Sequence, residues 1–381
     1  MKSFWSYLIN NIITIPFSFF SYLIPKNDKI WVFGAWYGKR YNDNSRFLYE
    51  YVNKFHKDIK TIWLTRDLKM FKKLKNNNKN VYLIKSFLGI YYSFIAKYQI
   101  CCNTAQEDLN KYSLCSKNYI INLWHGAPIK NIDPLSKNGK YAMKIVDYLK
   151  KLFFYPKINL FCSLSENDKK IFKKRFSKNV IITGFPRNDI LYKTNKNKSK
   201  IKKILYLPTF RGCYNKTKKT NFFENLNIKI FSKWLKNNHI TFYTKLHPLD
   251  NNENKNLQTN NFKFIKDDEI DELYVFLKDI DILITDYSSV VFDFLFTNKP
   301  IILYAFDLKK YKKTQGMYYN LKNIAPGPVC NKWSEVINEI KKINKNNDKY
   351  KNKRKKIAKQ FIKHYDNKSC QRIIKYILNN G

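Results

Sequence analysis

The sequence predicts an α/β protein with two domains, each built on a parallel β-sheet that helices cover on both faces. The chain has 381 residues, which exceeds one average domain. Short apolar runs of strand length alternate with amphipathic helical stretches along most of it. A basic, asparagine-rich stretch at 193–203 separates two such series and is typical of a linker. Because strands that alternate with helices form parallel sheets, we expect two Rossmann-like domains that face a cleft.

Strands are expected on both sides of this linker. They lie at 29–36, 59–64, 81–84, 99–102, 119–124, 159–163 and 180–183 before it, and at 204–207, 241–245, 262–265, 281–285 and 301–304 after it. Between them, residues such as Ile270, Leu273, Tyr274 and Leu277 have the spacing of an amphipathic helix. The predicted organisation is an arm at 1–25, an N-terminal Rossmann-like domain at 26–195, a C-terminal Rossmann-like domain at 200–345 and C-terminal helices at 346–381.

The chain is strongly basic, with 72 Lys and Arg against 29 Asp and Glu and a net charge of +43. Dense positive charge suits nucleic-acid backbones. Here the excess is mostly Lys spread along the chain, beside abundant Asn, Ile, Tyr and Phe, as an AT-rich genome would produce. This pattern favours compositional drift together with attraction to anionic lipid, and no nucleic-acid partner is expected. A non-enzymatic protein that binds nucleic acid or membranes through charge remains an alternative.

The cysteines indicate a reducing compartment. There are seven of them, an odd number, and none forms a C-x-x-C pair. Reduced thiols explain this better than a disulfide framework, and zinc is disfavoured. Neither a Walker-type loop nor a dinucleotide-binding G-x-G-x-x-G occurs, so ATPase and nicotinamide-dependent activities lose their usual support. We expect no metal site and no cofactor.

Residues 1–25 are the candidate targeting segment. Asn10, Asn11 and Pro16 interrupt the apolar run that a spanning helix needs. As a helix, the segment would have an apolar stripe formed by Trp5, Leu8, Ile12, Ile15, Phe19 and Leu23, and a polar face formed by Tyr7, Asn10, Asn11, Thr14, Ser18 and Ser21. We expect it to lie in the cytoplasmic face of the membrane as a peripheral, monotopic anchor on anionic lipid. The alternatives are an arm packed on the protein and a single span.

Polar residues suited to chemistry follow the predicted strands, which is where ligands bind in open α/β sheets. They are His125 and Gly126 after 119–124; Arg187, Asn188 and Asp189 after 180–183; Thr209 and Arg211 after 204–207; His247 after 241–245; and Asp286, Ser288 and Ser289 after 281–285. We expect these loops to face one cleft, because the carboxyl ends of parallel strands share one edge of a sheet.

Two of these residues are histidines suited to proton transfer. His125 precedes Gly-x-Pro, so its ring is expected to be exposed, where an imidazole can take a proton from an attacking hydroxyl. The alternative is a histidine that packs or caps a turn. His247 would come from the other domain and could donate a hydrogen bond or a proton to a leaving phosphate.

The serines and arginines point to phosphate. Ser288 and Ser289 stand where a strand turns into a helix, so free N–H groups and the helix dipole could hold a diphosphate; simple helix capping is the alternative. Arg187 and Arg211 are rare arginines in a lysine-rich chain, which suggests bidentate contact with phosphate or carboxylate. A structural salt bridge, such as Arg187 with Asp189, is the alternative for them.

The motifs taken together resemble the CDP-glycerol glycerophosphotransferase family, the teichoic-acid polymerases and primases. They are WHGAPIK at 124–130, GFPRND at 184–189, LPTFR at 207–211, KLHP at 245–248, DILITDYSSVVFDF at 281–294 and KPIILYAFDLKKY at 299–311. The similarity runs from about residue 30 to 345 in the same order, and the Asp-Tyr-Ser-Ser block is its most specific part. Two positions depart from the family pattern: Ala127 replaces its common Thr, and Gln315 replaces an Arg.

The resemblance implies a GT-B-like fold with an N-terminal acceptor domain, a C-terminal nucleotide-donor domain and monotopic membrane attachment. It implies that His125 is the base, that His247 lies near the donor diphosphate and that Ser288 and Ser289 form the phosphate-binding turn. The expected reaction moves an alditol phosphate from a CDP-alcohol donor, such as CDP-glycerol, to a hydroxyl of a polysaccharide or lipid-linked, teichoic-acid-like acceptor and releases CMP. A sialyltransferase or polysialyltransferase, whose His-Pro and Ser-Ser motifs are similar and whose donor also releases CMP, is the alternative enzyme.

Overall fold

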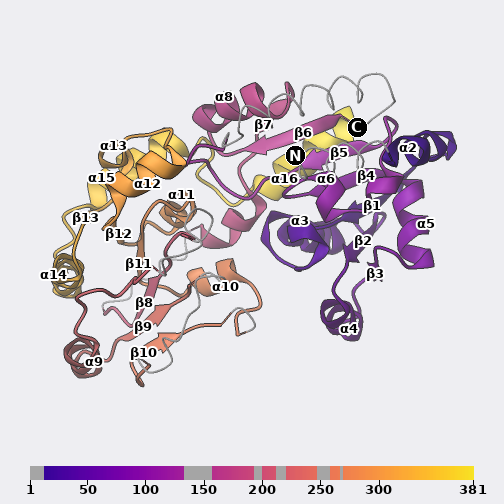
Figure 1. Cartoon of the computed structure of the whole chain (residues 1–381). Coiled ribbons are helices and arrows are strands. Elements are labelled where there is room, and N and C mark those ends of the chain that lie inside the picture. Colours follow the sequence, from indigo (N-terminus) through magenta and orange to yellow (C-terminus); the bar gives the residue numbers. More distant parts are fainter. Residues whose placement is uncertain (1–12, 133–156, 193–199, 212–219, 247–257, 267–268) are drawn as a thin grey trace. The chain divides into compact units, whose positions relative to one another are not determined.

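The computed structural model describes residues 13–132, 157–192, 200–211, 220–246, 258–266 and 269–381 (Figure 1). The chain divides into two compact units. Unit 1 comprises Met1–His125, Asp133–Arg187 and Lys368–Gly381, and unit 2 comprises Gly126–Ile132 and Asn188–Asn367. Each unit has its own parallel sheet and its own hydrophobic core, so the predicted pair of Rossmann-like folds is confirmed.

Unit 1 contains a seven-stranded sheet in the order β3-β2-β1-β4-β5-β6-β7, with all strands parallel. The strands are β1 (Asn27–Phe33), β2 (Lys60–Thr65), β3 (Val81–Leu83), β4 (Ala96–Cys101), β5 (Tyr119–Asn122), β6 (Ile158–Ser163) and β7 (Val180–Ile182). The chain builds outward from β1 to β3 and then returns to the other side of β1 with β4. The strand order therefore reverses between β1 and β4, and sheets of this kind bind ligands at the carboxyl ends of the strands beside such a reversal.

Helices connect these strands and cover the sheet. They are α2 (Thr14–Leu23), η1 (Trp36–Gly38), α3 (Asp43–Phe55), α4 (Leu68–Asn76), α5 (Phe87–Ile95), α6 (Ala105–Asp108), η2 (Lys111–Ser113), α8 (Glu166–Arg175), η3 (Pro186–Leu191) and α16 (Ser369–Asn380). Side chains cap several of them: Asp67 caps α4, Ser86 caps α5 and Ser165 caps α8 by accepting a backbone N–H of the first turn. Such caps satisfy donors that a helix start leaves unpaired.

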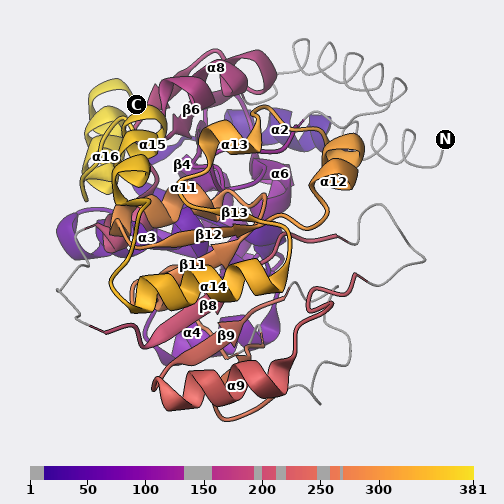
Figure 2. The ribbon, with the colours of Figure 1, turned by 90° about the vertical axis from the view of Figure 1, so that its left-hand side faces the viewer.

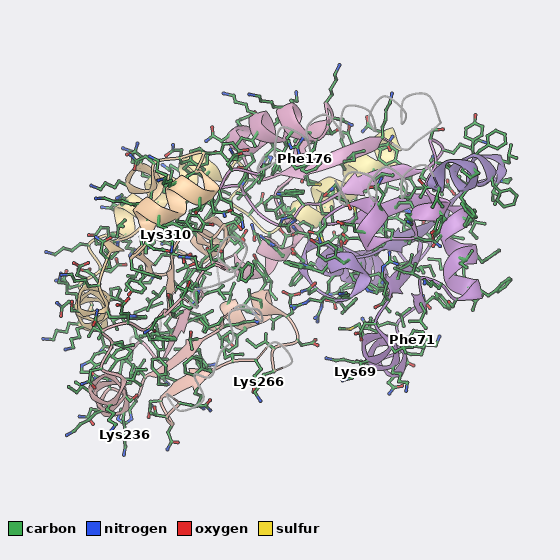
Figure 3. All side chains as sticks on the ribbon, in the orientation of Figure 1. Lys69, Phe71, Phe176, Lys236, Lys266 and Lys310 are labelled. Carbon is green, nitrogen blue, oxygen red and sulfur yellow. The ribbon has the colours of Figure 1, made fainter. Side chains whose placement is uncertain are left out.

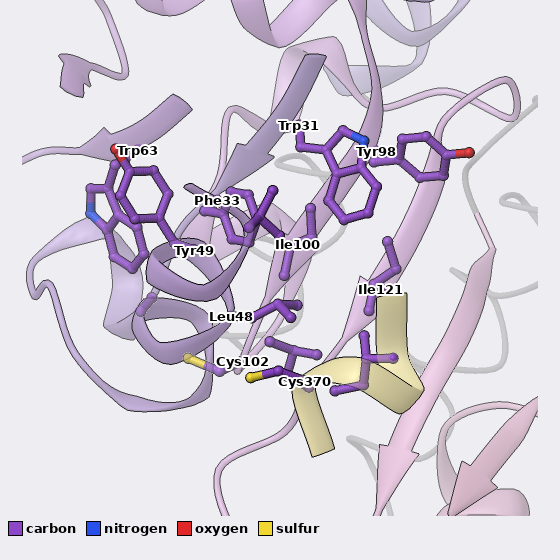
Figure 4. Close-up of a cluster of buried hydrophobic side chains, with 14 of the residues drawn as sticks. Trp31, Phe33, Leu48, Tyr49, Trp63, Tyr98, Ile100, Cys102, Ile121 and Cys370 are labelled. Carbon is purple, nitrogen blue, oxygen red and sulfur yellow. The ribbon is translucent and has the colours of Figure 1, made fainter. Parts of the chain in front are cut away.

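The main core of unit 1 lies between the sheet and the helices α3 and α16 (Figure 4). Trp31 and Phe33 of β1 point into it, and Phe33 meets the ring of Tyr49 edge to face with 5.4 Å between centroids. Ile30 and Val32, the alternate residues of β1, enter a second core cluster. Successive side chains of a strand point to opposite faces, so β1 is buried on both sides. This burial explains why the strand reads as one continuous apolar run.

The two last helices belong to different units. α15 (Lys351–Phe361) is part of unit 2, whereas α16 is part of unit 1, where Cys370, Ile373 and Ile377 enter the main core. The sequence had suggested one C-terminal block at 346–381. The helices separate because α16 is buried in the core of unit 1, whereas Phe361 of α15 stacks on Phe292 of α11 in unit 2.

Unit 2 contains a six-stranded sheet in the order β10-β9-β8-β11-β12-β13, again with all strands parallel. Its strands are β8 (Lys203–Tyr206), β9 (Thr241–Thr244), β10 (Phe262–Phe264), β11 (Ile282–Thr285), β12 (Ile301–Tyr304) and β13 (Val329–Cys330). Its further helices are α9 (Ile228–Asn237), α10 (Leu273–Leu277), α11 (Val290–Phe294), η6 (Leu295–Thr297), α12 (Leu308–Gln315), α13 (Leu321–Ile324) and α14 (Trp333–Asn344). Figure 2 shows α9 and α14 on one face of this sheet, where they share a core with it. Here the strand order reverses between β8 and β11.

Every strand that the sequence predicted is present, with ends displaced by at most three residues. Two predicted strands run too far because tryptophans extend their apolar pattern. Trp36 and Trp124 both have positive φ, of 48° and 55°, which ends an extended strand. β13 was not predicted, because two residues are too few to show a periodic pattern.

Helix α2 turns its polar face toward unit 1 and its apolar face outward. Thr14, Ser18 and Ser21 are buried, and the Ser21 hydroxyl donates to the carbonyl oxygen of Ser113 at 2.6 Å. Phe19 and Leu23 are exposed. The predicted faces are present in this part of the arm, while residues 1–12 lie outside the described residues. Within the part of the chain that the structure describes, no helix has the length and apolar character needed to cross a bilayer.

Lysine side chains extend outward from helices of both units, as Lys69 on α4, Lys236 on α9 and Lys310 on α12 illustrate (Figure 3). The positive charge is thus spread over many surface elements of the described chain. The attraction to anionic lipid that the composition suggested stays a prediction.

Candidate active site

His125 stands beyond the carboxyl end of β5, the second strand after the reversal in the unit 1 sheet. Its Nδ1 lies 3.1 Å from the carbonyl oxygen of Cys102, which follows β4. A carbonyl oxygen only accepts, so Nδ1 carries the hydrogen, and the neutral ring then has its proton-accepting lone pair at Nε2. The half-buried ring also stacks on Trp124, with 4.2 Å between centroids. This geometry is suited to a general base.

The backbone of Trp124 sets the direction in which this ring leaves the strand. Its φ of +55° is uncommon for a bulky residue and costs about 1–3 kcal/mol. The surroundings hold it there: its N–H donates to Asn122 Oδ1 at 2.8 Å, and its indole packs on Phe161 and Phe176. Gly126 follows with a φ of +135°, a conformation that glycine adopts without steric cost. His125 thus lies on a sharp turn with a defined shape.

Arg187 is buried in unit 1 and pairs with Asp43, the first residue of α3. Its Nη1 lies 2.8 Å from Asp43 Oδ1, and both side chains are almost fully shielded from solvent. Asp43 also accepts the indole N–H of Trp36 at 3.0 Å. A structural ion pair, one of the two roles that the sequence left open for Arg187, is therefore present.

Asp108 ties together the loops that follow β1 and β4. Its carboxylate accepts the backbone N–H groups of Tyr37, Cys102 and Asn103 at 2.8, 3.0 and 2.8 Å. Burial raises the pKa of Asp108, while these hydrogen bonds act in the opposite direction. Because the carbonyl oxygen of Cys102 contacts His125 and the N–H of Cys102 donates to Asp108, Asp108 helps to fix the backbone beside the histidine ring.

Four residues that motif reasoning did not single out contact the predicted ones or the backbone beside them. They are Asp43, Asn44 and Asp108 in unit 1 and Asp307 in unit 2. Asp43 and Asn44 carried a usable signal, because Asp and Asn are favoured where a helix starts and α3 begins at Asp43. Asp108 and Asp307 carried none, since isolated aspartates in a long sequence have no distinctive neighbours. Their partners become visible only once the sheets are assembled.

In unit 2, the loops after β8 and β11 meet beside the reversal of strand order. Asp286 is fully buried and accepts the N–H and the hydroxyl of Thr209 at 3.0 and 2.6 Å. Arg211 lies 2.7 Å from Asp286 and 2.8 Å from Asp307, so one guanidinium joins two carboxylates. The hydroxyl of Tyr287 donates to Asp307 at 3.0 Å. The structure thus brings together the predicted residues Thr209, Arg211 and Asp286.

Arg211 is also enclosed by aromatic rings. Its guanidinium lies 5.0 Å from the ring centroid of Tyr287 and 4.9 Å from that of Tyr311. Burial alone lowers the pKa of Arg211, but Asp286 and Asp307 outweigh it and raise the pKa above its usual value. Burial, with these carboxylates, also raises the pKa of Tyr287. The side chain of Arg211 is only 7% exposed and binds two carboxylates, so it holds together the loops that follow β8, β11 and β12.

Ser288 and Ser289 form the turn between β11 and α11, and both are half-buried. Ser289 occupies the cap position, but its side chain makes no capping hydrogen bond. Ser288 Oγ lies 3.4 Å from the N–H of Val290, which is a long contact. Helix capping, the alternative role of these serines, is therefore weak here. Their hydroxyls stand directly after Asp286 at the strand end where sheet ligands bind.

Residues 126–132, which follow His125, belong to unit 2 because they pair with the chain after α12. The N–H of Asn131 donates to the carbonyl of Gly316 at 3.2 Å, and the N–H of Tyr318 donates to that of Ile129 at 2.9 Å. Gly316 has φ +67°, and a Cβ there would lie 3.3 Å from the Cβ of Asn131. We call this pair of segments, 129–131 and 316–318, the ribbon.

Further residues that the sequence singled out flank the ribbon or lie in η3. Ala127 and Gln315, which depart from the family pattern, each stand just before one segment of the ribbon. Asn188 is fully buried and Asp189 half-buried, both in η3. His247 belongs to the segment 247–257, which is outside the described residues. Among the residues that are described, no three His, Cys, Asp or Glu side chains gather as metal ligands would.

Comparison with known proteins covers nearly the whole chain. The model of the family described as CDP-glycerol:poly(glycerophosphate) glycerophosphotransferase matches residues 16–379. The chain is 31% identical to the teichoic acid poly(glycerol phosphate) polymerase of Bacillus spizizenii over 84% of this chain and 85% of that protein. It is 28% identical to the teichoic acid glycerol-phosphate transferase of Staphylococcus aureus over 97% of both chains.

Solved structures agree on the fold. The wall teichoic acid polymerase TagF superposes with a TM-score of 0.73 at 22% identity, over 98% of this chain and 95% of that chain. The S. aureus MnaA–UDP co-structure is a more distant match, with a TM-score of 0.52 at 14% identity over 93% of this chain and 97% of that chain. The likeness to TagF, together with the two parallel sheets, confirms the predicted GT-B-like fold.

Proposed function

The chain belongs to the CDP-glycerol:poly(glycerophosphate) glycerophosphotransferase family, and from this premise we propose that it transfers glycerol phosphate from CDP-glycerol to a hydroxyl group of a teichoic-acid-like chain. Membership makes the chain an enzyme, and it decides against both a sialyltransferase and a non-enzymatic binding protein. The observation that carries the proposed mechanism is the contact between His125 and Cys102, which leaves Nε2 as the acceptor of a proton.

In the proposed reaction, His125 Nε2 takes the proton of the acceptor hydroxyl as its oxygen attacks the distal phosphorus of CDP-glycerol. A new bond forms between that oxygen and the phosphorus. The bond from the phosphorus to the bridging oxygen breaks, and its electron pair leaves with CMP. The acceptor is longer by one glycerol phosphate, and the imidazole holds the proton until solvent removes it. General-base catalysis of this kind contributes about 10²–10⁴-fold to rate.

We assign recognition of the donor to unit 2. The hydroxyls of Ser288 and Ser289 would hydrogen-bond the diphosphate, supported by their half-buried position after β11. Thr209, Asp286 and Arg211 would hold this turn in shape through their shared hydrogen bonds. His247, by its place in the KLHP motif, would donate a proton or hydrogen bond to the departing CMP.

We further propose that the enzyme attaches peripherally to the cytoplasmic face of an anionic membrane through α2 and α5, the apolar face. Both helices contact η2. The exposed side chains of the apolar face are Phe17, Phe19, Phe20, Leu23, Phe87, Leu88, Ile90, Tyr91 and Tyr112. Aromatic rings project outward from α2 in Figure 3. Lys85 and Lys117 are exposed beside these elements and could meet lipid phosphates.

A bilayer explains the apolar face better than solvent does. Monomeric soluble proteins rarely expose a contiguous group of large apolar side chains. In α2 the polar residues are the buried ones, so the helix presents to the outside the side that a water-facing helix would hide. Interfacial helices bury such apolar faces in the headgroup region. A membrane-bound enzyme would also meet a lipid-linked acceptor at the surface where that acceptor is anchored.

The function is tested by release of CMP. Purified protein is given CDP-glycerol, CDP-ribitol or CMP-sialate with a glycerol-phosphate-primed acceptor, and CMP is quantified by chromatography. We expect release from CDP-glycerol and none from CMP-sialate. Absence of CMP from every CDP-alditol would refute the proposed function.

The role of His125 is tested by His125→Asn in the same assay. We expect kcat to fall by about 10²–10⁴-fold with the melting temperature unchanged. His239→Asn is the matched control, because His239 is exposed and has a φ of +55° that asparagine tolerates. Near-normal turnover of His125→Asn would refute the assignment of the base while leaving the function in place.

A further inference from the structure

Asn44 joins the turn that carries His125 to the loop after β7. Its side chain is fully buried in the first turn of α3. Its Nδ2 donates to the carbonyl oxygen of Trp124 at 2.7 Å, while its Oδ1 accepts the N–H of Arg187 at 3.1 Å. An amide can do both at once, because it has a donor group and an acceptor atom. One side chain at the start of α3 therefore clamps the segments that follow β5 and β7.

From this geometry we infer that Asn44 is a positioning residue for the proposed base. It holds the Trp124 peptide in the left-handed conformation from which His125 reaches the carbonyl of Cys102. This inference rests on the proposed role of His125 in glycerol-phosphate transfer.

The clamp acts on the carbonyl end of Trp124, while other contacts act on its N–H and its indole. Asn122 holds the N–H of Trp124, and packing on Phe161 and Phe176 holds its indole. The carbonyl of Trp124 belongs to the peptide that leads into His125, and Asn44 is its donor. A strained φ persists only where the surroundings over-determine it. Without this donor, the peptide between Trp124 and His125 loses a buried hydrogen bond that fixes its orientation, and the imidazole shifts relative to Cys102.

The clamp is itself rigid. The N–H of Asn44 donates to Asp43 Oδ1 at 2.8 Å, and the same oxygen pairs with Arg187 Nη1 at 2.8 Å. Asp43 thus holds the backbone of Asn44 while the guanidinium of Arg187 holds Asp43. The ion pair and the clamp form one buried network. Through it Arg187 helps to hold Asn44 in place, and this role needs no contact with phosphate.

The identity of the residue matters as well as its size. An aspartate in place of Asn44 would keep an oxygen for the N–H of Arg187 but would lose Nδ2. It would then direct a carboxylate oxygen at the carbonyl of Trp124, and the two acceptors would repel each other. Asn44→Asp therefore removes the clamp with almost no change in volume.

The test measures kcat and KM of Asn44→Asp with CDP-glycerol. We expect kcat to fall about 10–100-fold, as for loss of a partner that orients a catalytic group, with KM within about twofold of wild type. Asn53→Asp is the matched control. It lies on the same helix, its Nδ2 donates to the carbonyl of Tyr49 at 2.9 Å, and it should leave kcat unchanged.

A second readout separates positioning from general stability. Long-range nitrogen–proton NMR reports which ring nitrogen of a histidine is protonated, and the chain has five histidines, so His125→Asn assigns the signal. We expect wild type to show one tautomer, protonated at Nδ1, and Asn44→Asp to show a mixture. If Asn44→Asp does not fold, Asn44→Ser, whose shorter hydroxyl cannot span both partners, provides the same comparison.

Three results would overturn the inference: wild-type kcat in the Asn44 variants, lost kcat with an unchanged His125 tautomer, or a lowered melting temperature as the sole effect. These results are distinct from failure of the proposed function. That failure would appear as absence of CMP release by the wild-type protein in the same assay.

Discussion

Arg211 and Asp286 form an ion pair 2.7 Å long, in which the side chains are 7% and 0% exposed. Asp307 accepts from Nε of the same guanidinium at 2.8 Å and from Nη2, which Asp286 also binds, at 3.0 Å. These residues follow β8, β11 and β12, so one charged cluster fastens three strand ends of unit 2. The cluster stands directly before Ser288 and gives the proposed donor turn its shape.

Arg211→Met should destabilise the protein by about 3–5 kcal/mol, because it leaves two carboxylates buried without a cation. Urea unfolding followed by circular dichroism measures this. Arg46→Met is the matched control, since its ion pair with Glu50 is partly exposed and should be worth at most about 1 kcal/mol. Equal losses in the two variants would contradict the structural role of Arg211.

Ser289→Ala should leave stability within about 0.5 kcal/mol of wild type, because the hydroxyl makes no capping bond. It should lower kcat/KM for CDP-glycerol about tenfold if this hydroxyl binds the diphosphate, since a lost hydrogen bond to a charged group costs about 1.5–3 kcal/mol. Ser165→Ala is the converse control. Ser165 does cap its helix, so this change should cost about 1 kcal/mol of stability and leave kcat/KM intact. Unchanged kcat/KM in Ser289→Ala would remove Ser289 from the donor site.

Gly316→Ala should cost about 1–3 kcal/mol, because alanine does not tolerate φ +67° and its Cβ would press on Asn131. The ribbon would then loosen, and with it the segment that continues from His125, so kcat should also fall. Thermal melting and CMP release measure the two effects. Thr314→Ala is the control. Thr314 is exposed in the last turn of α12, the helix that ends just before Gly316, so this change should alter neither stability nor kcat. A Gly316→Ala enzyme with wild-type stability would show that the ribbon is not needed.

The double change Phe19→Ser and Phe87→Ser should weaken binding to vesicles of phosphatidylcholine and phosphatidylglycerol by at least about tenfold, because each phenylalanine contributes about 1.5–3 kcal/mol when fully buried. Both rings are exposed, at 53% and 81%. Co-sedimentation measures the bound fraction. Ile230→Ser is the control, an exposed apolar residue on α9 of unit 2. Equal binding by the double variant and the control would rule out the apolar face as the membrane contact.

Asp108 should make stability depend on pH. Burial raises the pKa of Asp108 in the folded chain above its usual value of about 4, which it has in the unfolded chain. At a pH between the unfolded-state pKa and the folded-state pKa, the folded chain keeps a proton that the unfolded chain has released. Unfolding therefore releases protons, and the free energy of unfolding falls as pH rises through this window. Asp108→Asn cannot ionise, so its curve should be flatter there. Urea unfolding at a series of pH values measures both, and parallel curves would contradict the shift.

Much of the candidate site followed from local patterns. His125, Arg187, Arg211 and Ser288 were found because each stands where an apolar run ends, and parallel strands end on one edge of a sheet. The motifs also identified the family correctly, as the match over the chain shows. Motif reasoning could not separate a phosphate-binding arginine from a buried ion pair, because the partner Asp43 lies 144 positions away from Arg187.

By itself, the sequence determined the two series of strands and helices, the two-domain α/β class and the polar residues that follow the strands. These follow from periodicity and turn residues, which are local properties. Only the tertiary structure decided that β4 lies beside β1 and β11 beside β8, because crossover connections set strand order and leave no local trace. The pairing of β5 with β4 brings His125 to Cys102, and the pairing of β11 with β8 brings Asp286 to Arg211. The geometry of His125, Arg187 and Arg211 depends on such distant partners, so the fold assigned it where the sequence could only propose that these residues matter.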